Sequence, residues 1–139
     1  MPLLLRPNQN KIPAFTLTEV LVVLIIIGIL ILLALPNLMP LITKAKSTEA
    51  KIQLTHVYTL EKNFFFEKSK YTTELSDISF EQQSLSSNGG QANYRIEIIE
   101  TTTNGFRARA TAVVDFDGDG TFNVWEIDQN KNLTETIPD

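Results

Sequence analysis

The sequence predicts an α+β protein in which a long N-terminal α-helix packs on a small antiparallel β-sheet head. Three observations support this prediction. Residues 15–42 are almost entirely apolar, residues 43–68 carry an apolar stripe at helical spacing, and residues 94–112 alternate apolar and polar side chains around an Asn-Gly pair. The chain has 139 residues, which is enough for one domain.

The apolar segment, residues 15–42, is the feature on which the other predictions depend. Between Val20 and Leu35 no side chain is charged or strongly polar. About twenty helical residues, each rising about 1.5 Å, match the ~30 Å hydrocarbon core of a bilayer. A helix buried in a soluble core would show a polar face at a period of 3.6 residues, whereas this segment is apolar on all sides. We therefore expect a membrane-inserting helix.

Glu19 is an acidic residue at the edge of this apolar segment. An unpaired carboxylate in a bilayer is unfavourable, so it needs a cationic partner or contact with water. Residues 15–42 contain no basic side chain. Two interpretations stay open from this residue alone. Glu19 either reaches water at the headgroup boundary or meets a cation that another molecule supplies.

A short leader, residues 1–14, precedes the apolar segment and contains two basic residues and no acidic one. A secretory signal peptide would place its small-residue cleavage site after the apolar segment. Here a small residue, Ala14, comes before it. Cleavage after Ala14 would leave a free ammonium group on Phe15, and a neighbouring copy of the chain could bring that ammonium to Glu19.

This order of residues, a short basic leader, a small residue and then Phe-Thr-Leu-x-Glu opening an apolar helix, closely resembles the class III signal of type IV prepilins and type II secretion pseudopilins. The resemblance covers about residues 11–45. It implies that a prepilin peptidase cuts between Ala14 and Phe15 and methylates the new amine of Phe15. It also implies that Glu19 docks the subunit into a filament.

Gly28 and Pro36 match the positions at which the helix of this family is loosened. A Gly in a helix costs about 1 kcal/mol and an interior Pro about 3 kcal/mol, so the helix can extend locally between them. Two residues depart from the family pattern. Ala14 stands where Gly is usual, and Thr18 stands where an aliphatic residue is commoner.

The resemblance also implies the partners and the location of the protein. The expected partners are copies of itself and related pilins in a helical filament, the prepilin peptidase, an inner-membrane assembly platform, and membrane lipid before assembly. The expected location is the bacterial inner membrane, followed by an extracellular or periplasmic filament. A type IV pilus subunit is favoured, and a pseudopilin of a type II secretion system that drives protein export stays as the alternative.

Charge argues against a nucleic-acid partner. Removing the leader leaves ten basic against sixteen acidic residues, a net charge of −6. Binding to nucleic acid requires a basic face, which such a balance does not favour. The chain also lacks cysteine, so no disulfide framework is expected.

Residues 43–68 are predicted to continue the helix as an amphipathic half that packs on the head, residues 69–139. Glu61 interrupts an apolar stripe formed by Leu54, Val57, Tyr58, Phe64 and Phe65. Residues 69–91 are rich in Ser, Thr, Gln and Gly and read as a loop with at most one helical turn.

Strands are predicted after this loop. Residues 94–99 and 106–112 alternate with a period of two, and Thr103-Asn104-Gly105 between them reads as a tight hairpin turn. The alanines at alternate positions of the second strand indicate a face pressed close against another element, plausibly the helix. Residues 124–127 are a candidate third strand. A small sheet of this kind needs a covering helix to bury its apolar face.

Residues 115–126, DFDGDGTFNVWE, fit the calcium-loop spacing D-x-[DN]-x-[DN]-G-x5-E and resemble EF-hand-like and dockerin-like loops. Calcium prefers six to eight oxygen ligands. The expected ligands are the side chains of Asp115, Asp117, Asp119 and Glu126, the carbonyl of Thr121, and Asn123 directly or through water. If residues 121–127 form a strand, the Glu126 side chain points away from the loop and Asp128 becomes the candidate ligand. The alternative is an acidic hairpin turn that holds no metal.

No enzymatic activity is expected. The chain has no cysteine, one isolated histidine (His56), and neither a G-x-S-x-G motif nor a phosphate-binding loop, so no nucleophile or acid–base pair can be assigned. A membrane-anchored, calcium-dependent binding module is kept as a remote alternative.

Overall fold

The computed structural model describes residues 13–139. The leader prediction therefore lies outside the described residues, except for Pro13 and Ala14. The chain divides after Pro36 into two units, the second of which is Asn37–Asp139. The sequence predicts the change from the apolar to the amphipathic segment after residue 42, six residues beyond this division. The helix α1 (Leu17–Lys68) begins in the first unit and ends in the second.

In the first unit, α1 is a helix without a buried side. Every residue from Leu17 to Pro36 is exposed, including large apolar side chains such as Leu32 at 70%. By its length and composition, α1 is the one helix among residues 13–139 that could cross a membrane. Gly28 and Pro36 both lie within the uninterrupted helix, and a Cβ at residue 28 would meet no side chain within 4 Å beyond its two chain neighbours. Loosening of the helix at these positions stays a prediction.

In the second unit, α1 buries one narrow stripe. Its buried residues recur at alternating intervals of three and four, which is the spacing of a single helix face: Thr43, Ser47, Ala50, Leu54, Val57 and Glu61. After Lys68, Ser69 adopts a left-handed conformation (φ 57°), and its N–H donates to the Phe65 carbonyl at 2.8 Å. This αL cap ends the helix.

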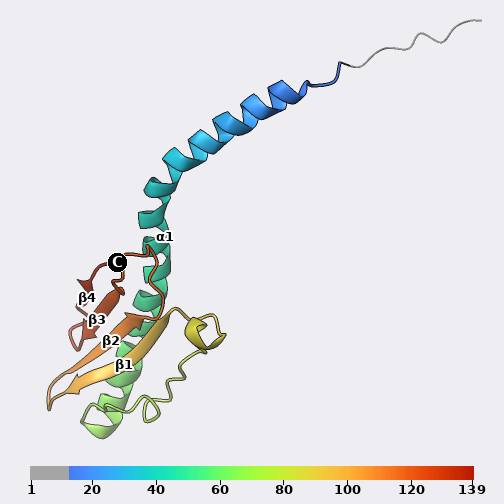
Figure 1. The fold of residues 1–139 in the computed structure, drawn as a ribbon. Coiled ribbons are helices and arrows are strands. Elements are labelled where there is room, and N and C mark those ends of the chain that lie inside the picture. The colour runs from blue at the N-terminus through green and yellow to red at the C-terminus, as the bar shows by residue number, and fades with distance from the viewer. Residues whose placement is uncertain (1–12) are drawn as a thin grey trace, which may run out of the picture. The chain divides into compact units, whose positions relative to one another are not determined.

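The sheet has four antiparallel strands in the order β1-β2-β3-β4, and α1 lies along one of its faces (Figure 1). The strands are β1 (Tyr94–Thr101), β2 (Phe106–Ala112), β3 (Val124–Asp128) and β4 (Leu133–Ile137). The predicted α+β class, a long N-terminal helix with a small antiparallel sheet, is confirmed. The sequence analysis missed β4, because its pattern LTETI is short and almost fully exposed.

One hydrophobic core joins the helix to the sheet. Leu54 and Val57 of α1 share this core with Ile96 of β1 and with Ala108 and Ala110 of β2. Both alanines are 0% exposed. The small side chains at these positions therefore belong to the core that the sheet shares with the helix. The opposite face of β1 and β2 carries charged side chains, so the sheet is covered on one side only.

The predicted hairpin between β1 and β2 forms with a short turn, but the Asn-Gly pair does not adopt the type I′ conformation. The N–H of Thr102 donates to the Gly105 carbonyl at 2.8 Å, so the loop comprises residues 102–105. Neither Asn104 nor Gly105 has a positive φ, which a type I′ Asn-Gly turn requires. Gly105 lies close to another turn: a Cβ there would lie 2.6 Å from Oε1 of Gln129, so the end of that flexible side chain would have to move.

Leu54→Ala tests the core between α1 and the sheet. Because Leu54 is 0% exposed, we expect the free energy of unfolding to fall by about 2–5 kcal/mol through lost burial and a residual cavity. Ile52→Ala is the matched control, since Ile52 lies on the same helix and is 63% exposed. Thermal unfolding of the full chain in detergent micelles measures both. Equal losses for the two variants would contradict the described packing.

Candidate functional site

The start of α1 places Glu19 in a capping box. Since the helix begins at Leu17, Thr16 is the N-cap residue and Glu19 occupies the third helical position. The backbone N–H and the hydroxyl of Thr16 donate to Oε2 of Glu19 at 2.8 and 2.9 Å. The N–H of Glu19 donates back to the Thr16 hydroxyl at 3.3 Å. This reciprocal pattern satisfies orphan donors of the first turn. The sequence analysis missed it, although the signal T-x-x-E was present.

The capping box leaves Glu19 able to accept one more partner. Both hydrogen bonds from Thr16 use Oε2, and within residues 13–139 no hydrogen bond to Oε1 is formed. Glu19 is exposed, as are Ala14 and Phe15, and the Phe15 side chain is 85% exposed. The described structure therefore brings the predicted cleavage position and the carboxylate to the same accessible end of α1. Within residues 13–139 no cationic side chain forms an ion pair with Glu19.

A second acidic site lies in the loop between β2 and β3. The Asp115 carboxylate accepts the N–H groups of Gly118 and Gly120 at 2.6 and 2.7 Å. Gly118 and Gly120 have φ values of 82° and 90°, which favour glycine. The bond from Gly120, with further hydrogen bonds in the loop, lowers the pKa of Asp115 below its ordinary value. The D-x-D-G-D-G spacing thus builds a tight turn around a carboxylate that stays ionised.

Asn123, a predicted calcium ligand, is a buried residue whose side-chain oxygen and nitrogen both have partners away from the acidic loop. Its side chain is 0% exposed, and Oδ1 accepts the Tyr94 hydroxyl at 2.7 Å. Its Nδ2 donates to Oε1 of Glu135 at 2.7 Å and to the Ile137 carbonyl at 3.0 Å. Burial raises the pKa of Tyr94, which keeps its hydroxyl a donor to Asn123. Asn123 therefore joins β1, β3 and β4 instead of facing the loop.

The predicted ligand Glu126 and its alternative Asp128 also lie away from the acidic loop. Residues of β3 alternate between the two sheet faces, and Glu126 pairs with Arg109, with Nη2 at 2.7 Å and Nε at 2.8 Å. Asp128, at the end of β3, accepts the N–H groups of Asn130 and Asn132. In an EF-hand, the carboxylate at position twelve of the loop binds the calcium, and a helix follows. Here a strand, β3, follows the loop instead.

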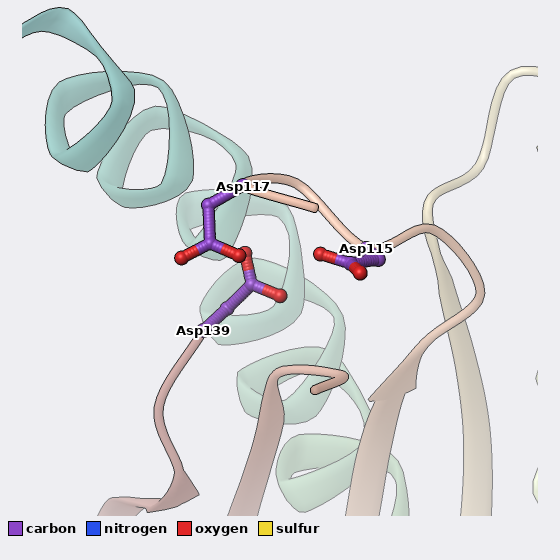
Figure 2. A group of neighbouring side chains, drawn as sticks. All are labelled: Asp115, Asp117 and Asp139. Carbon is purple, nitrogen blue, oxygen red and sulfur yellow. The ribbon is translucent and has the colours of Figure 1, made fainter. Parts of the chain in front are cut away.

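Asp139, rather than Glu126, lies beside the acidic loop. Carboxylate oxygens of Asp115, Asp117 and Asp139 all lie within 4.8 Å of one another. Figure 2 shows the carboxylates of Asp117 and Asp139 facing each other, with Asp115 beside them. Asp139 is held by the Phe116 N–H, at 3.2 Å from Oδ2, and by the Thr43 hydroxyl at 3.4 Å. No spacing motif signals this residue, because β4 separates it from the loop.

Asp115, Asp117 and Asp139 form an acidic cluster, and their carboxylates are the kind of ligand that a hard divalent cation prefers. All three offer oxygen, and the cluster contains neither histidine nor cysteine, so calcium or magnesium fits better than zinc. Burial, followed by the negative charge of Asp117, raises the pKa of Asp139 above its ordinary value. Asp119 lies in the same loop but accepts the N–H of Thr121 at 2.6 Å and is not part of the cluster.

Comparison with known proteins supports the fold and the N-terminal site. The sequence model of the prokaryotic N-terminal methylation motif matches residues 10–35. The chain is 38% identical over 82 residues to the type IV major pilin protein PilA of Myxococcus xanthus strain DK1622. That alignment covers 59% of this chain and 36% of the pilin, so the chain spans about a third of the length of this relative.

Among solved structures, the chain resembles the non-core minor pilin PilV of Neisseria meningitidis, with a TM-score of 0.51. The match covers 70% of this chain and 90% of the other, at 10% identity. The two structures therefore share a pilin-like α+β fold. The methylation motif contains the segment from Ala14 to Glu19, on which the sequence-based resemblance to pilins rested.

Asn123→Ala distinguishes a structural residue from a metal ligand. Losing its three hydrogen bonds leaves the Tyr94 hydroxyl and the Ile137 carbonyl without partners, which lowers the free energy of unfolding by about 1–3 kcal/mol. We expect the same loss in calcium and in chelator, measured by thermal unfolding of the full chain. A loss seen in calcium alone would restore Asn123 as a ligand.

Proposed function

We propose that this protein is a structural subunit of a type IV pilus-like filament. The observation that carries the proposal is the accessible start of α1. There an uncovered apolar helix begins at Leu17, two residues after Phe15, and the Glu19 carboxylate keeps Oε1 without a hydrogen bond within the described residues. Before assembly, the inner membrane covers the apolar helix. After the prepilin peptidase removes residues 1–14 and methylates Phe15, copies of the same helix cover one another in the filament.

The physical basis of assembly is the apolar surface together with one charge pair. An apolar helix whose side chains are all exposed is stable only in lipid or against other apolar surfaces. Stacked copies supply such surfaces, and the cationic amine of one Phe15 meets the Glu19 carboxylate of the next copy. In the low dielectric of a helix bundle this attraction is stronger than in water, so it fixes the axial position of each subunit.

A pilus is favoured over a secretion pseudopilus because both compared proteins are named as pilins. The assembly platform of the inner membrane and the prepilin peptidase are the partners that this proposal requires. The filament itself would lie outside the inner membrane. The role is structural rather than enzymatic, since assembly requires no reaction catalysed by this chain.

Glu19→Gln tests the charge without removing the helix cap. A glutamine at the third helical position still accepts the Thr16 hydrogen bonds, so α1 keeps its start. We expect the variant to be processed and to stay in the membrane but to form filaments at a strongly reduced level, because its neighbour's amine has no counter-charge. Shearing of surface filaments and immunoblotting of the fractions measure assembly.

Mass analysis of the mature N-terminus gives the matched control. We expect wild type and Glu19→Gln to begin at Phe15, each with the added mass of a methyl group. Glu67→Gln removes an exposed glutamate later in α1 and is expected to assemble normally. If Glu19→Gln assembles as well as wild type, the charge pair is not required and the assembly proposal fails at this step.

We also propose that the acidic cluster binds calcium, with Asp139 in place of Glu126, while the carbonyl of Thr121 stays a candidate ligand. A cation would relieve the repulsion among the three carboxylates and connect the loop to Asp139, whose carboxylate also accepts the hydroxyl of Thr43 of α1. Residues 115 and 117 keep their predicted roles in this proposal, whereas Asn123 and Asp128 have none.

Calcium addition tests this second proposal. We expect millimolar calcium to raise the melting temperature of the full chain in micelles by a few degrees relative to chelator, because a ligand stabilises the state that binds it. Asp139→Asn should abolish this difference, whereas Glu126→Gln should keep it. An unchanged wild-type melting temperature, or loss of the difference in Glu126→Gln alone, would remove the proposed cluster.

A further inference from the structure

Glu61 is a carboxylate buried inside the core-facing stripe of α1. Its side chain is 0% exposed. Oε2 accepts a hydrogen bond from the backbone N–H of Thr72 at 3.3 Å, and Oε1 is buried without a hydrogen-bond partner. The role of α1 in a filament does not use this residue, and an apolar side chain would continue the stripe. The position therefore requires an explanation of its own.

The surroundings of Glu61 disfavour its charged form. Asp77, in the segment after α1, is a second negative charge near it. The nearest lysine along the helix, Lys62, directs its ammonium to the Tyr71 hydroxyl at 3.2 Å. Lys131, from the β3–β4 turn, lies over the Tyr58 ring. No salt bridge to Glu61 is formed within residues 13–139, and β2 presents apolar side chains such as Phe106 to this part of the core.

These surroundings raise the pKa of Glu61 to about 7. Burial is the largest cause, the bond from Thr72 acts in the opposite direction, and the charge of Asp77 adds to the increase. A buried carboxylate normally needs several donors or a cation to stay ionised. A single backbone donor at 3.3 Å does not replace the water that the carboxylate loses.

Thr72, the partner of Glu61, fixes the segment that connects α1 to the sheet. The Thr72 hydroxyl donates to Oδ2 of Asp77 at 2.8 Å and accepts the N–H of Glu74 at 3.1 Å. The same segment inserts Ile78 and Phe80 into the core. Left-handed serines, Ser69 and Ser79 (φ 57° and 55°), stand at its two ends. Non-glycine residues with left-handed φ values carry backbone strain, which the contacts around Thr72 must offset.

We propose that Glu61 is a proton-controlled latch, whose neutral carboxyl holds residues 71–80 against α1 and whose ionisation releases this segment toward solvent. A residue in the left-handed conformation stands near each end of the segment, and a single hydrogen bond ties it to Glu61. Opening has to expose the core side chains of the segment, such as Ile78 and Phe80, and the ionisation of Glu61 offsets part of this cost. Opening lets water reach both oxygens of Glu61 and separates them from Asp77. The sheet and the remainder of α1 keep their packing.

The direction of the pH effect follows from the raised pKa. Glu61 binds its proton more tightly in the native state than in the unfolded chain, where its pKa is near the ordinary 4.5. The stabilisation is therefore complete below about pH 4.5 and is lost as the pH rises through about 7. Asp115, whose pKa is lowered, acts in the opposite direction and only at acidic pH. The release of residues 71–80 is thus expected near neutral pH.

Amide hydrogen exchange of the full chain in detergent micelles tests the latch. Protection factors, corrected for the intrinsic pH dependence of exchange, are measured for residues 71–80 between pH 5.5 and 8.5. We expect protection of this segment in the wild type to fall about tenfold or more over this range, with a midpoint near 7. Protection of β2 should stay constant.

Three variants separate the latch from a purely structural role. Glu61→Gln keeps an acceptor for Thr72 but cannot ionise, so its protection should stay high at all pH values. Glu67→Gln, at an exposed position of the same helix, should behave as wild type. Asp77→Asn removes the neighbouring negative charge, so Glu61 ionises more easily and the midpoint should move to lower pH.

The proposal is overturned by a wild-type segment whose protection does not change with pH. It is equally overturned by a Glu61→Gln variant that loses protection as wild type does, or by an Asp77→Asn variant with an unmoved midpoint. If Glu61→Gln does not fold, the wild-type titration and the Asp77→Asn midpoint decide between the two roles.

Discussion

The packing of this protein depends on one helix, α1, that has two different environments. Up to Pro36, α1 exposes apolar side chains on every side, and nothing in the described chain covers them. After Pro36 the same helix becomes a scaffold, because its stripe supplies the cover that a four-stranded sheet needs. The head thus depends on the helix for its core, and the helix depends on other molecules for its first half.

Acidic side chains have three different roles along this chain. Glu19 is exposed and caps the start of α1, so it stays available to a cation. Asp115 is exposed and surrounded by backbone donors, which keeps it charged. Glu61 is enclosed with a single donor, which favours its neutral form. The number of donors and the access of water, rather than the residue type, decide whether each group carries its charge.

The sequence predicted the features that depend on periodicity. The apolar run, the helical stripe and the alternating strands each repeat over many residues, so the fold class and the course of α1 could be derived before the structure was known. The methylation motif likewise lies in one continuous stretch, residues 10–35. In both cases neighbours in the sequence determine the outcome.

The features that sequence analysis missed depend on contacts between distant residues. Asp139 reaches the acidic loop only because β4 returns the chain to it, whereas Glu126, which fits the loop motif, pairs with Arg109 instead. Asn123 fitted the calcium spacing, yet its neighbours Tyr94 and Glu135 come from other strands. Glu61 looked like an interruption of the stripe, because no local pattern shows that Thr72 folds back on it.

The contact between Gly105 and Gln129 couples two turns that are far apart in the sequence. A side chain at position 105 would occupy the space of the Gln129 amide, which lies at the far end of a flexible chain. A larger residue at 105 therefore requires the end of the Gln129 side chain to move away, which a flexible side chain does at small cost. The two turns of the head thus touch through a side chain that can adapt to its neighbour.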